Sequence, residues 1–396
     1  MRQIPAYAGM TVVNYLYIRY FLFSVLRTTL YHHNDPTIRS LDGLRGVAIL
    51  LVLLFHCFEY LYLTGMGWMG VDLFFVLSGF LITRILLRTK SERGYFKNFY
   101  IKRTLRIFPL YYLFIIACLV LSLVFNLERL NPIRHYWGYF ITYLQNFLFC
   151  SLNGFIPRFA MSHLWSLAVE EHFYLVWPLV VYFLPNKKLL YICIFTILLS
   201  TLLGVAIFMY NHSLITVYTF TFTRIGTIVL GSMLAILAVH KKEVLEQWAL
   251  PVLIVSFLLI TGFYIKVFFT ENPEHYSFIF HPYTTIRNSY GAMFLVVAFF
   301  FAALLCIALS KSFVATIFSW QPLVFFGKYS YGIYMLHFPV YFILRGYIEV
   351  FLRSHAVHEM VLRLLTSLAC TVVTVLLSLV VYHAFEKHFL KLKKKF

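Results

Sequence analysis

Two ionisable residues, Arg45 and His56, stand eleven positions apart inside the apolar run that extends from Arg39 to His56. Such side chains at membrane depth cost roughly 2.5–3.5 kcal/mol each even on a lenient insertion scale, so they usually serve a function. On an α-helix, eleven residues close almost three turns and would place both groups on one face, about 16 Å apart. A fixed cation and a titratable imidazole in this arrangement suit a long anionic substrate whose reactive end is delivered part-way into the membrane. An equally open alternative is that Arg45 marks the cytoplasmic helix end and His56 makes an interhelical hydrogen bond.

Two adjacent glutamates, Glu170 and Glu171, enter another apolar run, which extends from Ser162 to Trp177. Neighbouring helix positions point about 100° apart, so the two carboxylates cannot reach one partner from the same face. A carboxylate here could orient an imidazole across the bundle, as base-orienting groups do in catalytic pairs. The alternative is an interhelical ion pair with Arg224 or Arg103.

Further polar groups lie at helical spacing in other apolar runs. Ser78 precedes Gly79, and the glycine would let either a partner helix or a substrate chain approach the backbone. His337 belongs to a polar stripe that core hydrogen bonding explains almost as well as substrate contact does. The other members of that stripe are Ser330, Tyr331 and Tyr334.

A basic segment, Lys102, Arg103 and Arg106, stands at the start of a further apolar run. These side chains could bind the phosphates of a nucleotide-bearing donor or the headgroups of lipids, and composition does not separate the two uses.

The elements that must position these groups are transmembrane helices. With 61% hydrophobic and 12% charged residues, the chain has the composition of an all-α polytopic membrane protein. We expect ten spans of about 20 residues each, near Gly43–Tyr62, Trp68–Leu87, Leu105–Phe125, His163–Leu184, Leu189–Tyr210, Val217–Val239, Leu250–Phe269, Tyr290–Ser310, Leu323–Leu344 and Val361–Tyr382.

Charge sets the expected topology. A shorter apolar segment, Tyr136–Cys150, contains Gln145 and Asn146. If this segment does not cross, four basic clusters share the cytoplasmic side with both termini, namely 84–106, 187–188, 240–242 and 391–395. We therefore expect ten spans with both termini cytoplasmic and a re-entrant or outer-face segment at 136–150.

The net charge of +18 is explained by these topology determinants and by contacts with anionic membrane lipids, so nucleic acid is not an expected partner. The six cysteines stand singly in apolar stretches and support neither a disulfide framework nor a metal site. Residues 1–38 are interrupted by charges and predict an extension, with an interfacial helix as one form of it. Residues 39–389 form the membrane domain, and residues 390–396 form a basic cytoplasmic tail.

Taken together, five segments resemble, in order, motifs of the membrane acyltransferase-3 family, which includes bacterial O-antigen and exopolysaccharide O-acetyltransferases. The segments are Leu41–Val47 with Arg45 and His56 in an R-x10-H arrangement, Phe74–Thr83, Arg103–Pro109, His163–Pro178 and Tyr331–Pro339. The resemblance extends from about Arg39 to Phe389. It implies a multi-pass protein of the bacterial cytoplasmic membrane that transfers an acyl group, usually acetyl from acetyl-CoA, to a hydroxyl of a cell-surface glycan or lipid-linked saccharide.

The resemblance also implies roles for residues. Arg45 and His56 match the essential pair of the family, Ser78 and Gly79 match its SGFL element, and Ser166 and Glu170 match its SxxxE element. Transfer from a thioester needs chiefly a base near the acceptor hydroxyl and stabilisation of the oxyanion.

We assign the base to His56, whose unperturbed pKa of about 6.5 lies near working pH, with Glu170 to orient it. Arg45, Arg103 and Arg106 would hold the CoA phosphates, so that the pantetheine arm spans the distance to His56. The remaining expected substrate contacts are Ser78, Gly79, Ser166, Glu171, Tyr331, Tyr334 and His337. No permanently bound cofactor and no metal are expected. Direct transfer and a covalent acyl-histidine both remain open.

Two segments depart from the family pattern. Thr223–Gly226 lacks an acidic residue that many relatives carry, so the sequence leaves open whether that segment forms its supporting ion pair. Glu386-Lys387-His388 replaces a Glu-x-Pro, so the last helix should end without a proline-defined turn. Relatives with an additional esterase-like domain continue beyond the last span, and the end at Phe396 suggests a stand-alone enzyme or one with a separate partner.

The main competing function is a transporter or flippase of an anionic or glycan-linked substrate. That class predicts inverted repeats and paired helices broken by Gly or Pro, and the sequence shows no such pair. The absence of a G-x-S-x-G motif disfavours a serine hydrolase relay.

Overall fold

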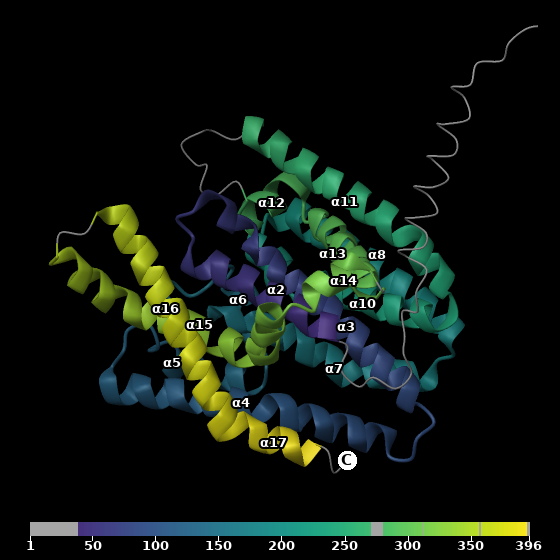
Figure 1. Cartoon of the computed structure of the whole chain (residues 1–396), viewed down its shortest axis with the longest axis horizontal. Helices are drawn as coiled ribbons and strands as arrows, with labels where there is room; N and C mark the ends of the chain where they lie inside the picture. The colour runs from purple at the N-terminus through teal and green to yellow at the C-terminus, as the bar shows by residue number, and fades with distance from the viewer. Residues whose placement is uncertain (1–38, 271–279, 311, 356–357, 394–396) are drawn as a thin grey trace, which may run out of the picture.

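Long apolar helices dominate the computed structural model of this chain, which describes residues 39–270, 280–310, 312–355 and 358–393 (Figure 1). The expected extension at 1–38 and the last residues of the tail, 394–396, lie outside the described residues. The helices of the first half are α2 (Arg39–Cys57), η1 (Tyr62–Trp68), α3 (Met69–Thr89), α4 (Tyr95–Phe125), α5 (Ile133–Ile141), α6 (Gln145–Ser151), η2 (Ser162–Leu164), α7 (Trp165–Phe183) and α8 (Asn186–Asn211). Those of the second half are α9 (Leu214–Thr219), α10 (Thr221–His240), α11 (Lys242–Thr270), α12 (Pro282–Ser289), α13 (Met293–Leu309), α14 (Phe313–Phe318), α15 (Gln321–Arg353), α16 (Glu359–Val381), the π-helical η4 (Tyr382–Glu386) and α17 (Lys387–Leu392).

The expected all-α polytopic class is confirmed. Within the described residues, eight helical segments are long and apolar enough to cross a membrane, or nine if the bent pair of α12 and α13 is one span. Each of the ten predicted spans coincides with a helix. The tenth predicted span, which is not among these nine, is α7. This helix has 19 residues, and its two glutamates and one histidine make it too polar to count as a membrane span by composition. The bend of 115° between α12 and α13 is the one broken pair in the described part of the chain, and it has no counterpart in the first half there.

The segment predicted not to cross forms two short helices, α5 and α6, joined by a bend at Tyr143, which has a positive φ of 56°. The Gln145 side chain donates from Nε2 to the carbonyl oxygen of Leu164 (2.8 Å). Asn146 donates from Nδ2 to Oγ1 of Thr221 (2.8 Å). These two hydrogen bonds join α6 to the starts of α7 and α10. The buried polar side chains of Gln145 and Asn146 therefore have a structural role.

Helix α2, which carries Arg45 and His56, lies between α15 and α3. Its contact with α15 depends on residues that have no side chain. A Cβ added to Gly46 would lie 2.0 Å from the carbonyl oxygen of Leu323, and one added to Gly327 would lie 1.7 Å from the carbonyl oxygen of Asp42. Small residues allow helix backbones in membranes to meet in this way. The close contact brings the polar stripe of α15 against the face of α2 that carries the imidazole.

Helices α3 and α10 are joined by a fully buried ion pair. Arg224 donates from Nη2 to Oδ1 of Asp72 (2.7 Å), and both side chains are 0% exposed. The Arg224 guanidinium carbon also lies 3.8 Å from the centre of the Phe294 ring. The ion pair that the sequence left open for this segment is therefore present, because a different helix supplies the carboxylate. Arg224 therefore pairs with Asp72 and not with the glutamates of α7, which was the alternative interpretation of those glutamates.

The last described segment continues as a helix, as the missing proline predicted. The backbone runs from α16 through the π-helical η4 into α17, and α17 packs against α4. Figure 1 shows α17 beside α4 at one edge of the bundle. The described part of the basic tail therefore lies near the start of α4, where Arg103 and Arg106 are found.

The topology can be tested by reporter fusions placed on either side of α5 and α6. Fusions after Asn126 and after Asn153 should report the same side of the membrane, because neither intervening helix is long enough to cross. A third fusion after Asn186 should report the opposite side and serves as the control. Opposite sides for the first two positions would contradict the arrangement.

Candidate active site

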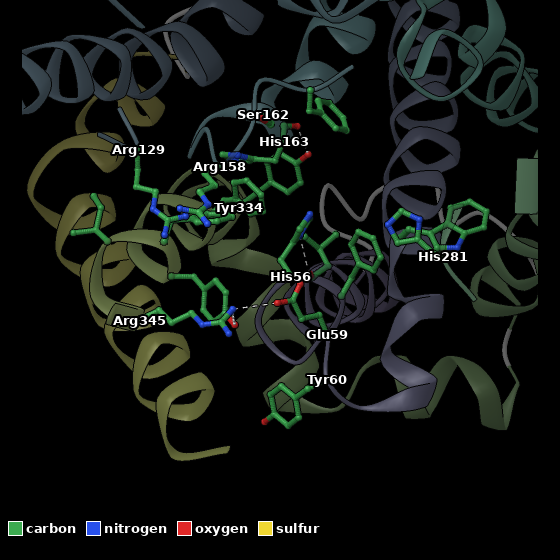
Figure 2. Close-up of a pocket in the computed structure, with 18 of the residues that line it drawn as sticks. His56, Glu59, Tyr60, Arg129, Arg158, Ser162, His163, His281, Tyr334 and Arg345 are labelled. Carbon is green, nitrogen blue, oxygen red and sulfur yellow. Dashed lines mark hydrogen bonds and ion pairs between the residues drawn. The ribbon is translucent and has the colours of Figure 1, made fainter. Parts of the chain in front are cut away.

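Two cavities follow one another along the bundle. The larger has a volume of about 1050 Å³ and includes His56 in its lining (Figure 2). The smaller has a volume of about 100 Å³ and is lined by Arg45, Arg103 and Arg106. Val71 and Tyr334 line both cavities. The cation and the imidazole of α2 therefore face two different spaces that meet at Tyr334.

The smaller cavity gathers positive charge. Arg45 pairs with Asp42 one turn away (Nη1 to Oδ1, 3.3 Å), and the Arg103 guanidinium carbon lies 4.4 Å from the centre of the Tyr174 ring. Lys393 lies close enough to be affected: burial and the neighbouring Arg106 lower the pKa of its ammonium group to about 8. Cations held this close together repel one another, so an anion bound among them would be stabilised. The predicted convergence of Arg45, Arg103 and Arg106 is present.

The carboxylate of the smaller cavity is Glu170, which accepts a hydrogen bond from the Ser78 hydroxyl. Both residues line the cavity with Arg45 and Arg103. Glu170 does not line the cavity that contains His56, and the structure shows no hydrogen bond between the two. The predicted orientation of His56 by Glu170 is therefore not what this geometry displays, because Glu170 lines the smaller cavity and His56 lines the larger one.

The group that contacts His56 is His337 of α15. Nε2 of His337 lies 3.1 Å from Nδ1 of His56, and this same Nδ1 lies 3.1 Å from the carbonyl oxygen of Val52. Nδ1 of His337 lies 2.7 Å from the carbonyl oxygen of Tyr334. His337 is fully buried, whereas His56 is partly open to the larger cavity.

These contacts determine where the protons are when both rings are neutral. A carbonyl oxygen only accepts, so His337 carries its proton on Nδ1 and its Nε2 is unprotonated. Nε2 of His337 then accepts from His56, which must carry its proton on Nδ1. Nε2 of His56 is left with a free lone pair. The geometry supplies a base with a fixed tautomer, and a histidine takes the orienting position in place of a carboxylate.

Tyr334 is held firmly at the junction of the cavities. Its hydroxyl lies 2.5 Å from Oγ of Ser166 and donates to the carbonyl oxygen of His163 (2.9 Å). Tyr331, predicted as a substrate contact, donates to the carbonyl oxygen of Ile107 (2.8 Å) and lines the smaller cavity. Ser166, Tyr331 and Tyr334 thus lie at the candidate site, as predicted.

Sequence reasoning left His163 out of the site, although its side chain is only 3% exposed and lines the larger cavity. Its ring centre lies 4.9 Å from that of His337, and neither ring nitrogen has a hydrogen-bond partner among the described residues. The signal in the sequence was its position three residues before Ser166, at the start of the same polar segment. Despite these neighbouring imidazoles, no three His, Cys, Asp or Glu side chains in the described part of the chain are grouped to hold a metal ion.

Two predicted contacts lie elsewhere. Glu171 is half-buried beside Arg103 and lines neither cavity. Gly79 faces α10: a Cβ there would lie 1.8 Å from the carbonyl oxygen of Ile228. The packing alternative for Gly79 is therefore the one the structure shows, since the helix backbone occupies the space that a substrate would need.

The fold and the site together define a class: a multi-pass membrane protein whose helices enclose a cluster of cations and an oriented imidazole. Residues 38–383 match the family described as acyltransferase domain, the acyltransferase-3 family. The chain belongs to this family, which confirms the resemblance drawn from its motifs.

Several curated proteins are similar to this chain. It is 32% identical over 329 residues to the putative peptidoglycan O-acetyltransferase YrhL of Bacillus subtilis. The aligned region covers 78% of this chain and 49% of YrhL. It is 31% identical over 335 residues to the peptidoglycan O-acetyltransferase OatA of Listeria monocytogenes, covering 79% of this chain and 50% of OatA. The O-acetyltransferase OatA of Staphylococcus aureus is 29% identical over 324 residues, with 78% and 51% covered. The chain thus spans about half the length of these relatives. No solved structure matches it.

The packing role of Gly79 predicts a loss of stability. Gly79→Ala should lower the melting temperature of the purified protein in detergent, because overpacking of this kind typically costs about 1–3 kcal/mol. Gly262→Ala in α11, where an added Cβ meets nothing within 4 Å, is the matched control and should leave the melting temperature unchanged. If Gly79 instead contacts substrate, its variant will melt normally and show only a kinetic defect.

Proposed function

We propose that this protein is an integral-membrane O-acyltransferase of the bacterial cytoplasmic membrane. It transfers an acyl group, most simply acetyl, from acyl-CoA to a hydroxyl of a cell-surface glycan or lipid-linked saccharide. Family membership and the O-acetyltransferase relatives support the reaction class. The single observation that carries the proposal is the oriented imidazole of His56, open to a large cavity that adjoins a cluster of arginines.

The arginine cluster suits the donor. CoA carries several phosphate charges at one end and a thioester at the end of a long flexible arm. Arg45, Arg103 and Arg106 would bind the phosphates at the cytoplasmic end of the bundle through charge-assisted hydrogen bonds. The arm then has to extend about 16 Å, the rise from Arg45 to His56 along α2. It would pass Tyr334, the residue shared by the two cavities.

The larger cavity suits the acceptor. Its volume of about 1050 Å³ exceeds what a single small molecule needs, and aromatic side chains such as Tyr341, Phe342 and Tyr347 line it. Sugar rings pack well on aromatic faces, and the charged side chains around the cavity offer hydrogen bonds to hydroxyls. Donor and acceptor would thus enter from opposite ends and meet beside His56.

The reaction then needs only what these residues provide. Nε2 of His56 takes the proton of the acceptor hydroxyl as its oxygen attacks the thioester carbonyl carbon. The His56 imidazolium that forms is stabilised because Nδ1–H is already directed at His337 and the Val52 carbonyl. Collapse of the tetrahedral intermediate breaks the carbon–sulfur bond, and His56 returns the proton to the departing thiolate. An ester and free CoA result.

Donor binding predicts a specific kinetic defect. The double change Arg103→Gln and Arg106→Gln should raise the apparent KM for acetyl-CoA with little change in the KM for the acceptor. We expect at least about a tenfold increase, since hydrogen bonds to charged groups contribute roughly 1.5–3 kcal/mol. Michaelis–Menten analysis with labelled acetyl-CoA measures this increase, and Lys187→Gln, at a basic residue in the first turn of α8 that lines neither cavity, is the control. An unchanged donor KM would assign the two arginines to lipid headgroups.

The function itself is tested by incubating the purified protein in lipid nanodiscs with radiolabelled acetyl-CoA and crude cell-envelope glycan. Wild-type protein should label the glycan, and His56→Ala should abolish labelling while melting near the wild-type temperature, because interhelical hydrogen bonds in membranes average only about 0.6 kcal/mol. His337→Phe should lower kcat and leave both KM values near normal, since it removes orientation and not binding. Uptake of a solute by proteoliposomes without any transfer would instead favour a transporter, and full activity of His56→Ala would refute the assignment of the base.

A further inference from the structure

Two arginines in the larger cavity, Arg129 and Arg158, differ from the other arginines that line it. Arg345 has two carboxylate partners, Glu59 (3.1 Å) and Glu349 (2.7 Å), and Arg363 pairs with Glu359 (3.0 Å). Arg129 and Arg158 form no ion pair with any acidic residue in the described part of the chain, Glu128 included, although both line the cavity. The side chains of the first group are therefore neutralised by the protein, whereas those of the second group are not.

The loops that carry the two arginines are fixed to one another. The backbone N–H of Ala160 donates to the carbonyl oxygen of Arg129 (3.0 Å). Residues on either side of this bond, Leu130 and Phe159, are at most 1% exposed. The guanidinium groups thus extend from rigid, buried bases. Figure 2 shows both reaching into the cavity from the same side, near Tyr334.

The two arginines differ in exposure, since Arg158 is exposed to water and Arg129 is not fully so. Arg129 is half-buried, and its guanidinium carbon lies 5.2 Å from the centre of the Phe342 ring. Arg158 has a positive φ of 57°, a conformation that non-glycine residues seldom adopt and that often marks a functional position. Two like charges on adjoining loops repel one another unless an anion lies between them.

We propose that Arg129 and Arg158 bind an anionic group, a carboxylate or a phosphate, on the acceptor. The acceptor class is then an acidic glycan or a glycan carried on a phosphate-linked lipid, held so that a neutral hydroxyl reaches Nε2 of His56. Guanidinium groups bind both anions in a bidentate manner, which fixes orientation as well as charge. This inference rests on the proposed function for the identity of the acceptor, but the anion site can be measured without transfer.

The position of the pair agrees with this role. Arg129 follows the end of α4, whereas Arg106 lies in the first half of this helix, and the 19 residue steps from Arg106 to Phe125 rise about 29 Å. That distance is about the thickness of the hydrocarbon core of a bilayer. The phosphates of the donor and the anion of the acceptor would therefore be bound on opposite sides of the membrane by separate groups of arginines.

The test compares wild-type protein with the double variant Arg129→Gln and Arg158→Gln. Envelope glycan is used untreated, after amidation of its carboxylates, and after removal of its phosphates. We expect the double variant to raise the KM for untreated glycan at least tenfold with kcat within twofold of wild type. One of the two treatments should raise the wild-type KM to the same level, which identifies the anion. Arg353→Gln, which removes an arginine that pairs with Glu359 (3.1 Å) and lines neither cavity, is the matched control and should not change the KM.

Equilibrium binding of fluorescently labelled glycan to the same proteins separates this proposal from the proposed function. If wild-type protein transfers no acyl group yet binds untreated glycan more tightly than the double variant does, the anion site stands and the reaction is wrong. Equal binding of all three glycans by wild type and variant would overturn the anion site. Nanodiscs of phosphatidylcholine, with and without phosphatidylglycerol, provide the remaining arm. A variant effect confined to discs with the anionic lipid would show that the arginines bind headgroups, which also overturns the proposal.

Discussion

The close contact of α2 with its neighbours is the constraint on which the candidate site depends. Gly46 and Gly327 let the backbones of α2 and α15 meet, and Gly79 does the same for α3 and α10. With side chains at these points the helices would stand farther apart, and the 3.1 Å contact between His56 and His337 would be lost. Membrane helices gain little from the hydrophobic effect between them, so close packing of small residues is their main source of association. The geometry of the candidate site therefore depends on glycines at helix contacts outside it.

The polar groups inside the bundle fall into two kinds. Asp72 and Arg224 neutralise one another, and both are closed off from any cavity. Breaking such a pair leaves an uncompensated buried charge, which is strongly destabilising. His56, Arg45 and Arg103 face cavities, where water or a ligand can reach them. Contact with a cavity therefore separates the candidate site from the structural ion pair more reliably than residue type does.

Much of the fold followed from the sequence because hydrophobic length and charge placement determine membrane helices almost directly. The convergence of Arg45, Arg103 and Arg106 was also predictable, since helical spacing and motif order located each of them. The pairs of side chains that meet across two helices could not be predicted. Nothing in the spacing of Glu170 indicated that Ser78 would be its partner, or that His337 would take the place beside His56. The carboxylate for Arg224 lay 152 positions earlier in the chain, and only tertiary packing reveals such a pair.

One helix carries both the cation of the smaller cavity and the imidazole of the larger one, and this has a consequence for how the family can vary. The interval between Arg45 and His56 is covalent, so it changes only by whole residues. One residue more or less would turn the imidazole by about 100° away from His337, and a lengthening of three or four would be needed to bring it back to the same face. The reach between the two cavities is therefore quantised in steps of about 5 Å, one helical turn. An acyl donor with an arm of different length can be accommodated by lengthening or shortening the interval between Arg45 and His56 by one helical turn, but not by a smaller change.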